Sequence, residues 1–152
     1  MNLSNPNQQK ITIGIVDDSH PYREALKYYF SQLADIEIMF EANDGVQLIQ
    51  SLKKMQPQVV LLDLDMPNVD GMVALSQLRN IYPSIKFIML TMYTEKALIS
   101  SFIAKGANSY LNKTADAEEI YTAIKRCCET DFYMNEWISD ALVHNVKNRV
   151  VN

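Results

Sequence analysis

The hydrophobic residues of this chain fall into short continuous runs, separated by longer segments with helical spacing. Apolar residues 59–62 lead directly into Asp63, and Pro67 and Gly71 mark a turn soon after. A continuous apolar run bounded by turn residues is typical of a strand that is buried on both faces, as in a parallel sheet. The sequence therefore predicts a buried strand that ends at Asp63.

Four further strands and five helices follow from the same pattern. The predicted strands are residues 11–16, 36–41, 85–90 and 108–111, and the segments of helical spacing are 22–33, 46–52, 72–81, 95–104 and 120–128. Ser19, Thr94 and the pair Asp116 and Glu119 are placed to cap helices, and Gly106 is placed to end one. In the fourth helix the apolar stripe is weak, with Ala97, Leu98 and Phe102 only.

Strict alternation of strands and helices predicts a parallel sheet with helices on both faces. Five such units fit a flavodoxin-like (βα)5 three-layer sandwich with strand order 2-1-3-4-5. The second strand, residues 36–41, alternates apolar and acidic residues. That pattern is typical of an edge strand with one face in water, which is where this order places it.

The ends of the chain lie outside these five units. Residues 1–9 are polar and read as a disordered N-terminal segment, residues 10–130 as one domain, and residues 131–152 as an extension. The spacing of apolar residues in the extension predicts one face of an extra helix: Trp137, Ile138, Ala141, Leu142 and Val146. This helix either packs on its own domain or forms a linker or dimer helix toward an output domain that is absent from this segment.

Charge and cysteine content narrow the function. The net charge of -4 disfavours direct nucleic-acid binding, which usually needs a basic surface. No apolar run approaches the roughly 18 residues of a membrane helix, and the N-terminal residues lack a signal-peptide core, so we expect a cytoplasmic protein with no membrane contact. Cys127 and Cys128 are adjacent and have no metal-ligand spacing.

Polar side chains follow the ends of four predicted strands. In the order 2-1-3-4-5 the first and third strands are neighbours, so Asp17, Asp18 and Asp63 meet at one edge of the sheet. Thr91 ends the fourth strand and Lys113 follows the fifth, which brings a hydroxyl and an ammonium to the same edge. Clustered carboxylates repel one another by about 4 kcal/mol at ~4 Å and an effective dielectric near 20.

Such a cluster needs a cation. Oxygen ligands without histidine or cysteine suit Mg²⁺, with Mn²⁺ as an alternative. A carboxylate beside Mg²⁺ and a lysine can act as a nucleophile toward a phosphoryl group. The ammonium and the threonine hydroxyl then stabilise the phosphoryl oxygens.

These residues resemble the receiver domain of bacterial two-component response regulators, over residues 10–130. The resemblance rests on the following positions: Asp17-Asp18, Asp63 within Leu-Leu-Asp-Leu-Asp-Met-Pro, Thr91, and Tyr110 three residues before Lys113. Three segments are most similar to the NarL/LuxR-type branch: Asp-Asp with Arg23, Leu-Thr-Met, and Lys-Gly-Ala-Asn-Ser-Tyr-Leu-Asn-Lys.

The resemblance implies a role for each acidic residue. Asp63 would accept a phosphoryl group from a histidine kinase or a phosphotransfer protein. Asp18 and Asp63 would ligate Mg²⁺ directly, Asp17 would act through water, and the backbone carbonyl of Asp65 would complete the protein ligands. Catalysis beyond self-phosphorylation and dephosphorylation is not expected, so the chain is interpreted as a switch rather than an enzyme.

The resemblance also implies how the switch works. Lys113 would pair with the phosphoryl group, and Thr91 and Tyr110 would form the switch pair. A homodimer is expected through the face of the fourth helix, fifth strand and fifth helix, or through the first and fifth helices. Two positions depart from many receivers: Met92 stands where a small residue is common and can crowd the phosphoryl pocket, and Thr114 stands where proline is common, with a trans Lys113–Thr114 bond as the default.

Three alternatives remain open from the sequence. Asp63 and Asp65 after an apolar strand also resemble the Asp-x-Asp motif of haloacid-dehalogenase-type phosphatases, although there the motif ends the first strand of the core. The chain can also be a stand-alone receiver without an output domain. The third alternative is a degenerate receiver that works without phosphate. It fits the sequence least well, because the three carboxylates, the threonine hydroxyl and the lysine ammonium of the predicted site are all present.

Overall fold

The computed structural model describes residues 9–64 and 71–151 of the chain. Five parallel strands form one sheet in the order β2-β1-β3-β4-β5, as predicted. The strands are β1 (Ile11–Val16), β2 (Ile36–Ala42), β3 (Val59–Asp63), β4 (Lys86–Thr91) and β5 (Ser109–Asn112). The helices are α1 (His20–Ser31), α2 (Gly45–Lys54), α3 (Gly71–Ile81), α4 (Lys96–Ala104), α5 (Ala117–Thr130) and α6 (Glu136–Val151).

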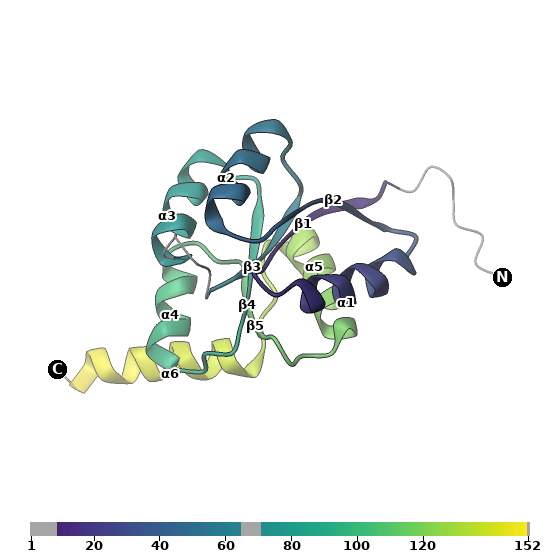
Figure 1. Ribbon diagram of the computed structural model, residues 1–152. Helices are drawn as coiled ribbons and strands as arrows, with labels where there is room; N and C mark the ends of the chain where they lie inside the picture. The colour runs from purple at the N-terminus through teal and green to yellow at the C-terminus, as the bar shows by residue number, and fades with distance from the viewer. Residues whose placement is uncertain (1–8, 65–70, 152) are drawn as a thin grey trace.

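Two hydrophobic clusters separate the sheet from its helices. Alternate residues of β3 point to opposite faces, so Val59 and Leu61 pack with α1 and α5, whereas Val60 and Leu62 pack with α2, α3, α4 and α6. Figure 1 shows this arrangement, with α1 and α5 on one side of the strands and α2 and α3 on the other. Both faces of β3 are buried, which explains its unbroken apolar run.

Some helix ends have the caps that the sequence predicted, and others do not. The Ser19 hydroxyl accepts a hydrogen bond from the backbone N–H of Tyr22 and caps α1, and Gly106 ends α4 in a left-handed conformation with φ 110°. The prediction that Thr94 caps α4 was wrong, because the helix begins later and the carbonyl of Glu95 accepts the first bond.

The capping box predicted for α5 was also wrong. Asp116 is the N-cap residue, but its side chain makes no capping hydrogen bond. The backbone carbonyl of Asp116 accepts the N–H of Glu119 instead, at 2.9 Å, so this first-turn donor is satisfied without the carboxylate. The apolar stripe of α5 lies where the sequence placed it, and Cys127 is buried within it.

The predicted extra helix exists and packs on its own domain. In Figure 1, α6 crosses the lower end of α4 at the edge of the molecule, and the two helices are in contact. Ile138 and Ala141 are fully buried, and the Ser100 hydroxyl on α4 donates a hydrogen bond of 3.0 Å to the Ala141 carbonyl. Val146 was predicted on this buried face but is exposed; it lies in the C-terminal half of α6, beyond the buried residues Ile138 and Ala141.

Contact with α6 also changes which side of α4 is buried. The sequence predicted a stripe of Ala97, Leu98 and Phe102. In the structure Phe102 is buried and Leu98 half-buried, but Ala97 is exposed and Ile99 and Ser100 are buried. The single-face prediction for α4 was therefore partly wrong, because α4 packs on both the sheet and α6.

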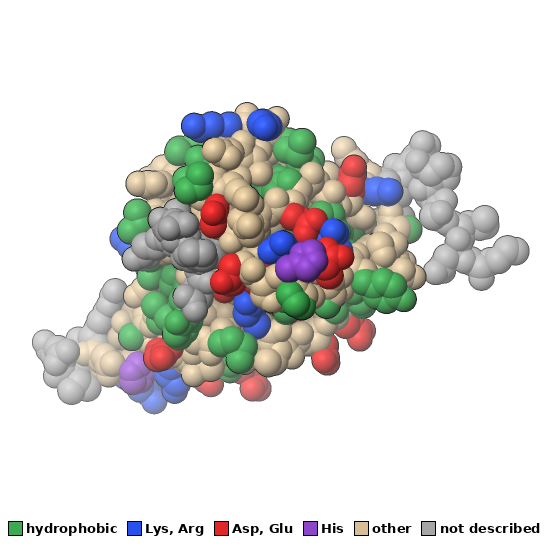
Figure 2. Space-filling model, viewed as in Figure 1, with side chains coloured by type: hydrophobic (Ala, Val, Ile, Leu, Met, Phe, Trp, Pro, Cys, Tyr) green, Lys and Arg blue, Asp and Glu red, His purple; other side chains and the backbone are tan. Residues whose placement is uncertain are grey.

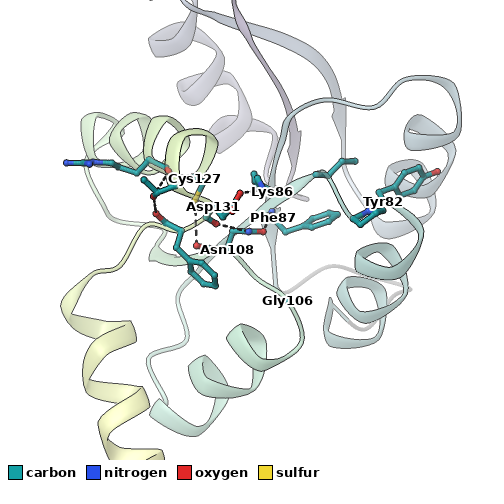
Figure 3. Close-up of polar contacts among 12 residues, drawn as sticks. Tyr82, Lys86, Phe87, Gly106, Asn108, Cys127 and Asp131 are labelled. Atoms are coloured by element: carbon teal, nitrogen blue, oxygen red, sulfur yellow. Dashed lines mark hydrogen bonds and ion pairs between the residues drawn. The ribbon is translucent and has the colours of Figure 1, made fainter.

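Buried hydrogen bonds connect β4 and β5 at the edge of the sheet opposite the predicted site. Asn108 lies just before β5 and is buried; its Oδ1 accepts the backbone N–H of Phe87 and the Arg79 guanidinium, both at 2.9 Å. Its Nδ2 donates to the carbonyl of Asp131 at 2.8 Å (Figure 3). One amide side chain thus joins α3, β4, β5 and the end of α5, at the sheet edge away from Asp63.

The described residues also show the length of the helices and the geometry of the peptide bonds. No helix among them is both long and apolar enough to cross a membrane. The described part of the chain contains no cis peptide bond, so the Lys113–Thr114 bond is trans, as expected.

Candidate functional site

The carboxyl ends of β1 and β3 bring three carboxylates together. Val16 pairs with Leu62 in the sheet, so Asp17 and Asp63, the next residue on each strand, lie at the same edge. Asp17, Asp18 and Asp63 each offer a carboxylate oxygen, and these oxygens lie within 4.8 Å of one another. Asp17 and Asp63 are buried and Asp18 is exposed. Figure 2 shows acidic and basic side chains gathered near the middle of the face in view.

Lys113 reaches the cluster from the end of β5. Its Nζ lies 2.7 Å from Asp17 Oδ2 and 3.3 Å from Asp63 Oδ2. Partial burial disfavours the charged ammonium, but the hydrogen bond to Asp17 and the charge of Asp63 outweigh it and raise the pKa of Lys113. Lys113 therefore stays protonated between two buried carboxylates.

Asp17 is held by the turn that leads into α1. Its Oδ1 accepts the backbone N–H of Ser19 at 2.8 Å, and its carbonyl accepts the Arg23 guanidinium. Arg23 also pairs with Glu41 at the end of β2, at 3.2 Å. The conformation of Asp17 is thus fixed by groups outside the cluster, which keeps one carboxylate oriented toward Lys113.

Thr91 and Tyr110 are both buried and are linked through Tyr93. The Thr91 hydroxyl accepts the backbone N–H of Tyr93 at 3.0 Å, and the Tyr110 hydroxyl donates to the carbonyl of Tyr93 at 3.0 Å. Burial raises the pKa of Tyr110 to about 12, although the nearby Thr91 hydroxyl opposes the shift. The sequence did not identify Tyr93 as a site residue, because Tyr93 takes part through its backbone N–H and carbonyl.

A cavity of about 290 Å³ opens beside the cluster. It is lined by Asp18, Asp63, Thr91, Met92, Tyr93 and Lys113. Met92, which the sequence suggested can crowd this space, is 60% exposed and is one of the residues that line the cavity. The predicted carboxylate, hydroxyl and ammonium groups therefore share one open pocket.

One predicted site residue cannot be placed, and one residue near the site was not predicted. Asp65, whose backbone carbonyl was predicted as a metal ligand, lies outside the described residues. Tyr22 was predicted only to lie within the helical segment 22–33, yet its ring lies against Lys113, with Nζ 5.0 Å from the ring centroid. Ring contacts of this kind leave no motif in a sequence.

The donor set fits a hard divalent cation. All candidate ligands in the cluster are carboxylate oxygens, which suit Mg²⁺ or Mn²⁺ better than softer metals. Lys113 contributes one positive charge against three carboxylates, so a net negative charge remains for a cation to neutralise. The cluster can therefore bind a metal, with Asp17, Asp18 and Asp63 as the candidate ligands.

A doubly wound sheet with an acidic cluster, a threonine and a lysine at its carboxyl edge is the arrangement expected of a receiver-type domain. The family model of the response regulator receiver domain matches residues 13–125, and the chain belongs to this family. Its relatives include NreC and the NarL receiver, and the domain is of the NarL/LuxR branch, as the resemblance implied.

Curated relatives are longer than this chain. The transcriptional regulatory protein DegU of Brevibacillus brevis is 29% identical over 146 residues, which cover 96% of this chain and 61% of DegU. The response regulator VraR of Staphylococcus aureus strain NCTC 8325 is 32% identical over 116 residues, which cover 76% of this chain and 56% of VraR. The chain thus spans less than two thirds of these relatives.

Solved structures of similar proteins have the same fold as this chain. The receiver domain of NarL from Mycobacterium tuberculosis has a TM-score of 0.76 and 25% identity, covering 80% of this chain and 98% of that one. RcsB of Salmonella typhimurium has a TM-score of 0.82 and 22% identity, covering 88% of this chain and 69% of that one. The flavodoxin-like arrangement is therefore that of known receivers.

Proposed function

We propose that this chain is a phosphorylation-activated switch in which Asp63 accepts a phosphoryl group from a histidine kinase or a phosphotransfer protein. The observation that supports this most strongly is the position of Asp63, which is buried beside Lys113 and opens onto the 290 Å³ cavity. No catalytic turnover is proposed beyond the phosphorylation and dephosphorylation of Asp63 itself.

The proposed transfer is a substitution at phosphorus. A carboxylate oxygen of Asp63 forms the new bond as the bond from phosphorus to the donor breaks, and the donor atom keeps the electron pair. Bound Mg²⁺, held by Asp17, Asp18 and Asp63, would supply charge neutralisation for the phosphoryl oxygens. We propose the backbone carbonyl of Asp65 as a further ligand.

Lys113 and Thr91 would stabilise the added group. Phosphorylation brings about -1.5 to -2 charge and three acceptor oxygens to Asp63. The Lys113 ammonium, already 3.3 Å from Asp63 Oδ2, would pair with one of these oxygens. The Thr91 hydroxyl would turn from its contact with Tyr93 to donate to another.

Movement of Thr91 would then pass to Tyr110. Both residues bond to Tyr93, so a shift of Thr91 disturbs the contact that holds the Tyr110 hydroxyl. The Tyr110 ring also packs against Phe102 of α4 and Trp137 of α6, with centroids 6.1 and 6.4 Å away. A change at Asp63 would thereby reshape the α4, β5 and α6 surface.

We infer that this surface controls a DNA-binding output domain. DegU is a transcriptional regulatory protein, and RcsB has been solved as a complex with DNA. Residues 10–130 would form the receiver and residues 131–152 the extension toward that output domain. Homodimers would form through the face of α4, β5 and α5 or through α1 and α5; α6 packs on α4 and contacts β5, so it covers part of the first face.

An experiment with Asp65 separates this function from a haloacid-dehalogenase-type phosphatase. If the chain were such a phosphatase, Asp65 would be the general acid, and Asp65→Asn would abolish hydrolysis of a small phosphomonoester. If the chain is a receiver, the wild type does not hydrolyse the phosphomonoester, and Asp65→Asn is still phosphorylated by acetyl phosphate with Mg²⁺. Steady phosphomonoester hydrolysis that disappears in Asp65→Asn would contradict the proposal.

A further inference from the structure

Tyr22 lies in the first turn of α1 beside the acidic cluster. Its ring contacts the Lys113 ammonium, with Nζ 5.0 Å from the ring centroid. Its hydroxyl is buried, and within the described residues it has no hydrogen-bond partner. Burial raises the pKa of Tyr22, and the charges of Asp17 and Asp63 raise it further.

Tyr22 is part of a series of contacts that begins and ends at Asp17. The backbone N–H of Ser19 donates to Asp17 Oδ1 at 2.8 Å, and the backbone N–H of Tyr22 donates to the Ser19 hydroxyl at 3.4 Å. The Tyr22 ring then contacts Lys113, whose Nζ returns to Asp17 Oδ2 at 2.7 Å. The helix cap therefore fixes the aromatic ring and the carboxylate relative to one ammonium.

Lys113 needs such support because its side chain is long and flexible. A lysine stem has several rotatable bonds, and an exposed ammonium samples many positions. Here the ammonium is only partly exposed and lies between two carboxylates and the face of an aromatic ring. The negative face of the ring attracts the cation, and the ring excludes water from that side.

We propose that Tyr22 is a positioning residue that holds the Lys113 ammonium at Asp63 and so increases the rate of phosphoryl transfer. The inference rests on the proposed phosphorylation of Asp63. Tyr22 touches neither the donor nor the phosphoryl group; it acts through Lys113. The aromatic ring, rather than the hydroxyl, is the part that acts.

The kinetic test compares Tyr22→Phe, which keeps the ring, with Tyr22→Leu, which removes it. Acetyl phosphate and Mg²⁺ serve as donor and metal, and the rate constant of Asp63 phosphorylation is measured. Tyr22→Leu should slow the reaction about fivefold, which corresponds to about 1 kcal/mol of lost stabilisation. Tyr22→Phe should keep most of the wild-type rate. Tyr28→Leu is the matched control, because Tyr28 lies on the same helix and is exposed.

The same substitutions are then repeated in a Lys113→Ala background. If Tyr22 acts through Lys113, Tyr22→Leu should change the remaining rate by less than about twofold there. An equal loss in both backgrounds would overturn the proposal and show that Tyr22 acts through the packing of α1. A Tyr22→Phe variant as slow as Tyr22→Leu would also overturn it, because the hydroxyl would then be the active part.

A second readout does not depend on phosphorylation. Protons above an aromatic ring resonate upfield, so the ε-methylene protons of Lys113 should be shifted upfield in the wild type and in Tyr22→Phe. They should return to ordinary lysine values in Tyr22→Leu, or in Tyr22→Met if the leucine variant does not fold. Unshifted protons in the wild type would overturn the ring contact. A shifted signal in a chain that acetyl phosphate cannot modify would instead contradict the proposed function alone.

Discussion

Among single residues, Tyr110 shows how a side chain can belong to both the core and the site. It is fully buried and packs between Phe102 and Trp137, as an aromatic residue in a short strand usually does. Its hydroxyl nevertheless reaches the carbonyl of Tyr93 beside Thr91. The sequence could suggest the pairing with Thr91 only by resemblance, since spacing gives no information on a contact made through backbone atoms.

Burial of Tyr110 predicts a loss of stability in alkali. An unfolded tyrosine ionises near pH 10, whereas burial raises the pKa of Tyr110 to about 12. Between these values the unfolded state loses a proton that the folded state keeps, so stability falls as pH rises. The slope is at most about 1.4 kcal/mol per pH unit.

Urea unfolding between pH 9 and 12 measures this slope. The wild type should lose stability more steeply than Tyr110→Phe, which has no proton to release. Tyr22 and Tyr121 also have raised pKa values, so only the difference between the two proteins reports on Tyr110. Parallel curves would show that Tyr110 ionises as easily in the folded state as in the unfolded one.

Thr91 gives the residue-level prediction for signalling. Thr91→Ala removes the hydroxyl that accepts from Tyr93 and, in the proposed switch, donates to the phosphoryl group. The variant should still be phosphorylated by acetyl phosphate, because Asp63 and Lys113 remain. Phosphorylation should change the fluorescence of Trp137, the single tryptophan of the chain, in the wild type and much less in Thr91→Ala. An equal change in both proteins would contradict the role of Thr91.

At the level of elements, several predictions succeeded where the face of a helix meets one face of the sheet. The apolar stripe of α5 and the unbroken run of β3 were both placed correctly. The prediction for α4 was partly wrong because a helix contacted on two sides has no single stripe, and the sequence did not show that α6 packs there. The buried amide of Asn108 was missed too, since it satisfies backbone groups far away in the sequence.

The packing of α6 on α4 leads to a stability prediction. Ile138 is fully buried against this contact, so Ile138→Ala should destabilise the protein by about 2–5 kcal/mol. Val143 lies on the exposed side of the same helix, and Val143→Ala should change stability by less than about 0.5 kcal/mol. Urea unfolding followed by circular dichroism measures both. Equal effects of the two substitutions would show that α6 does not pack as described.

For the molecule as a whole, topology accounts for the site. The order 2-1-3-4-5 followed from the alternation of elements, and with it the meeting of Asp17, Asp18 and Asp63. The same order placed Lys113 near them. The sequence could not give the distances, the series of contacts around Asp17 or the part played by Tyr22, because these depend on side-chain conformations that no local pattern encodes.

Charge repulsion within the cluster predicts a response to metal. Lys113 offsets only part of the charge of the three carboxylates, so the folded state keeps unfavourable repulsion. Mg²⁺ should raise the melting temperature of the wild type. Asp18→Asn in metal-free buffer should also raise it, by about 2–4 °C for each kcal/mol of repulsion removed.

Differential scanning calorimetry with and without Mg²⁺ checks this effect. Asp140→Asn is the matched control, because Asp140 is an exposed acidic residue on α6, away from the cluster. This control should keep the wild-type response to Mg²⁺, whereas Asp18→Asn should respond less. A melting temperature that stays constant or falls in Asp18→Asn would argue against the clustering of the carboxylates.

The central claim is that Asp63 is esterified reversibly by a phosphoryl group, with the help of a divalent cation held by its neighbours. Intact-mass spectrometry after incubation with acetyl phosphate tests it most directly. We expect one added phosphoryl group on the wild type with Mg²⁺, and none without Mg²⁺ or on Asp63→Asn. An unmodified wild type, or an Asp63→Asn variant that still gains the group, would contradict the account.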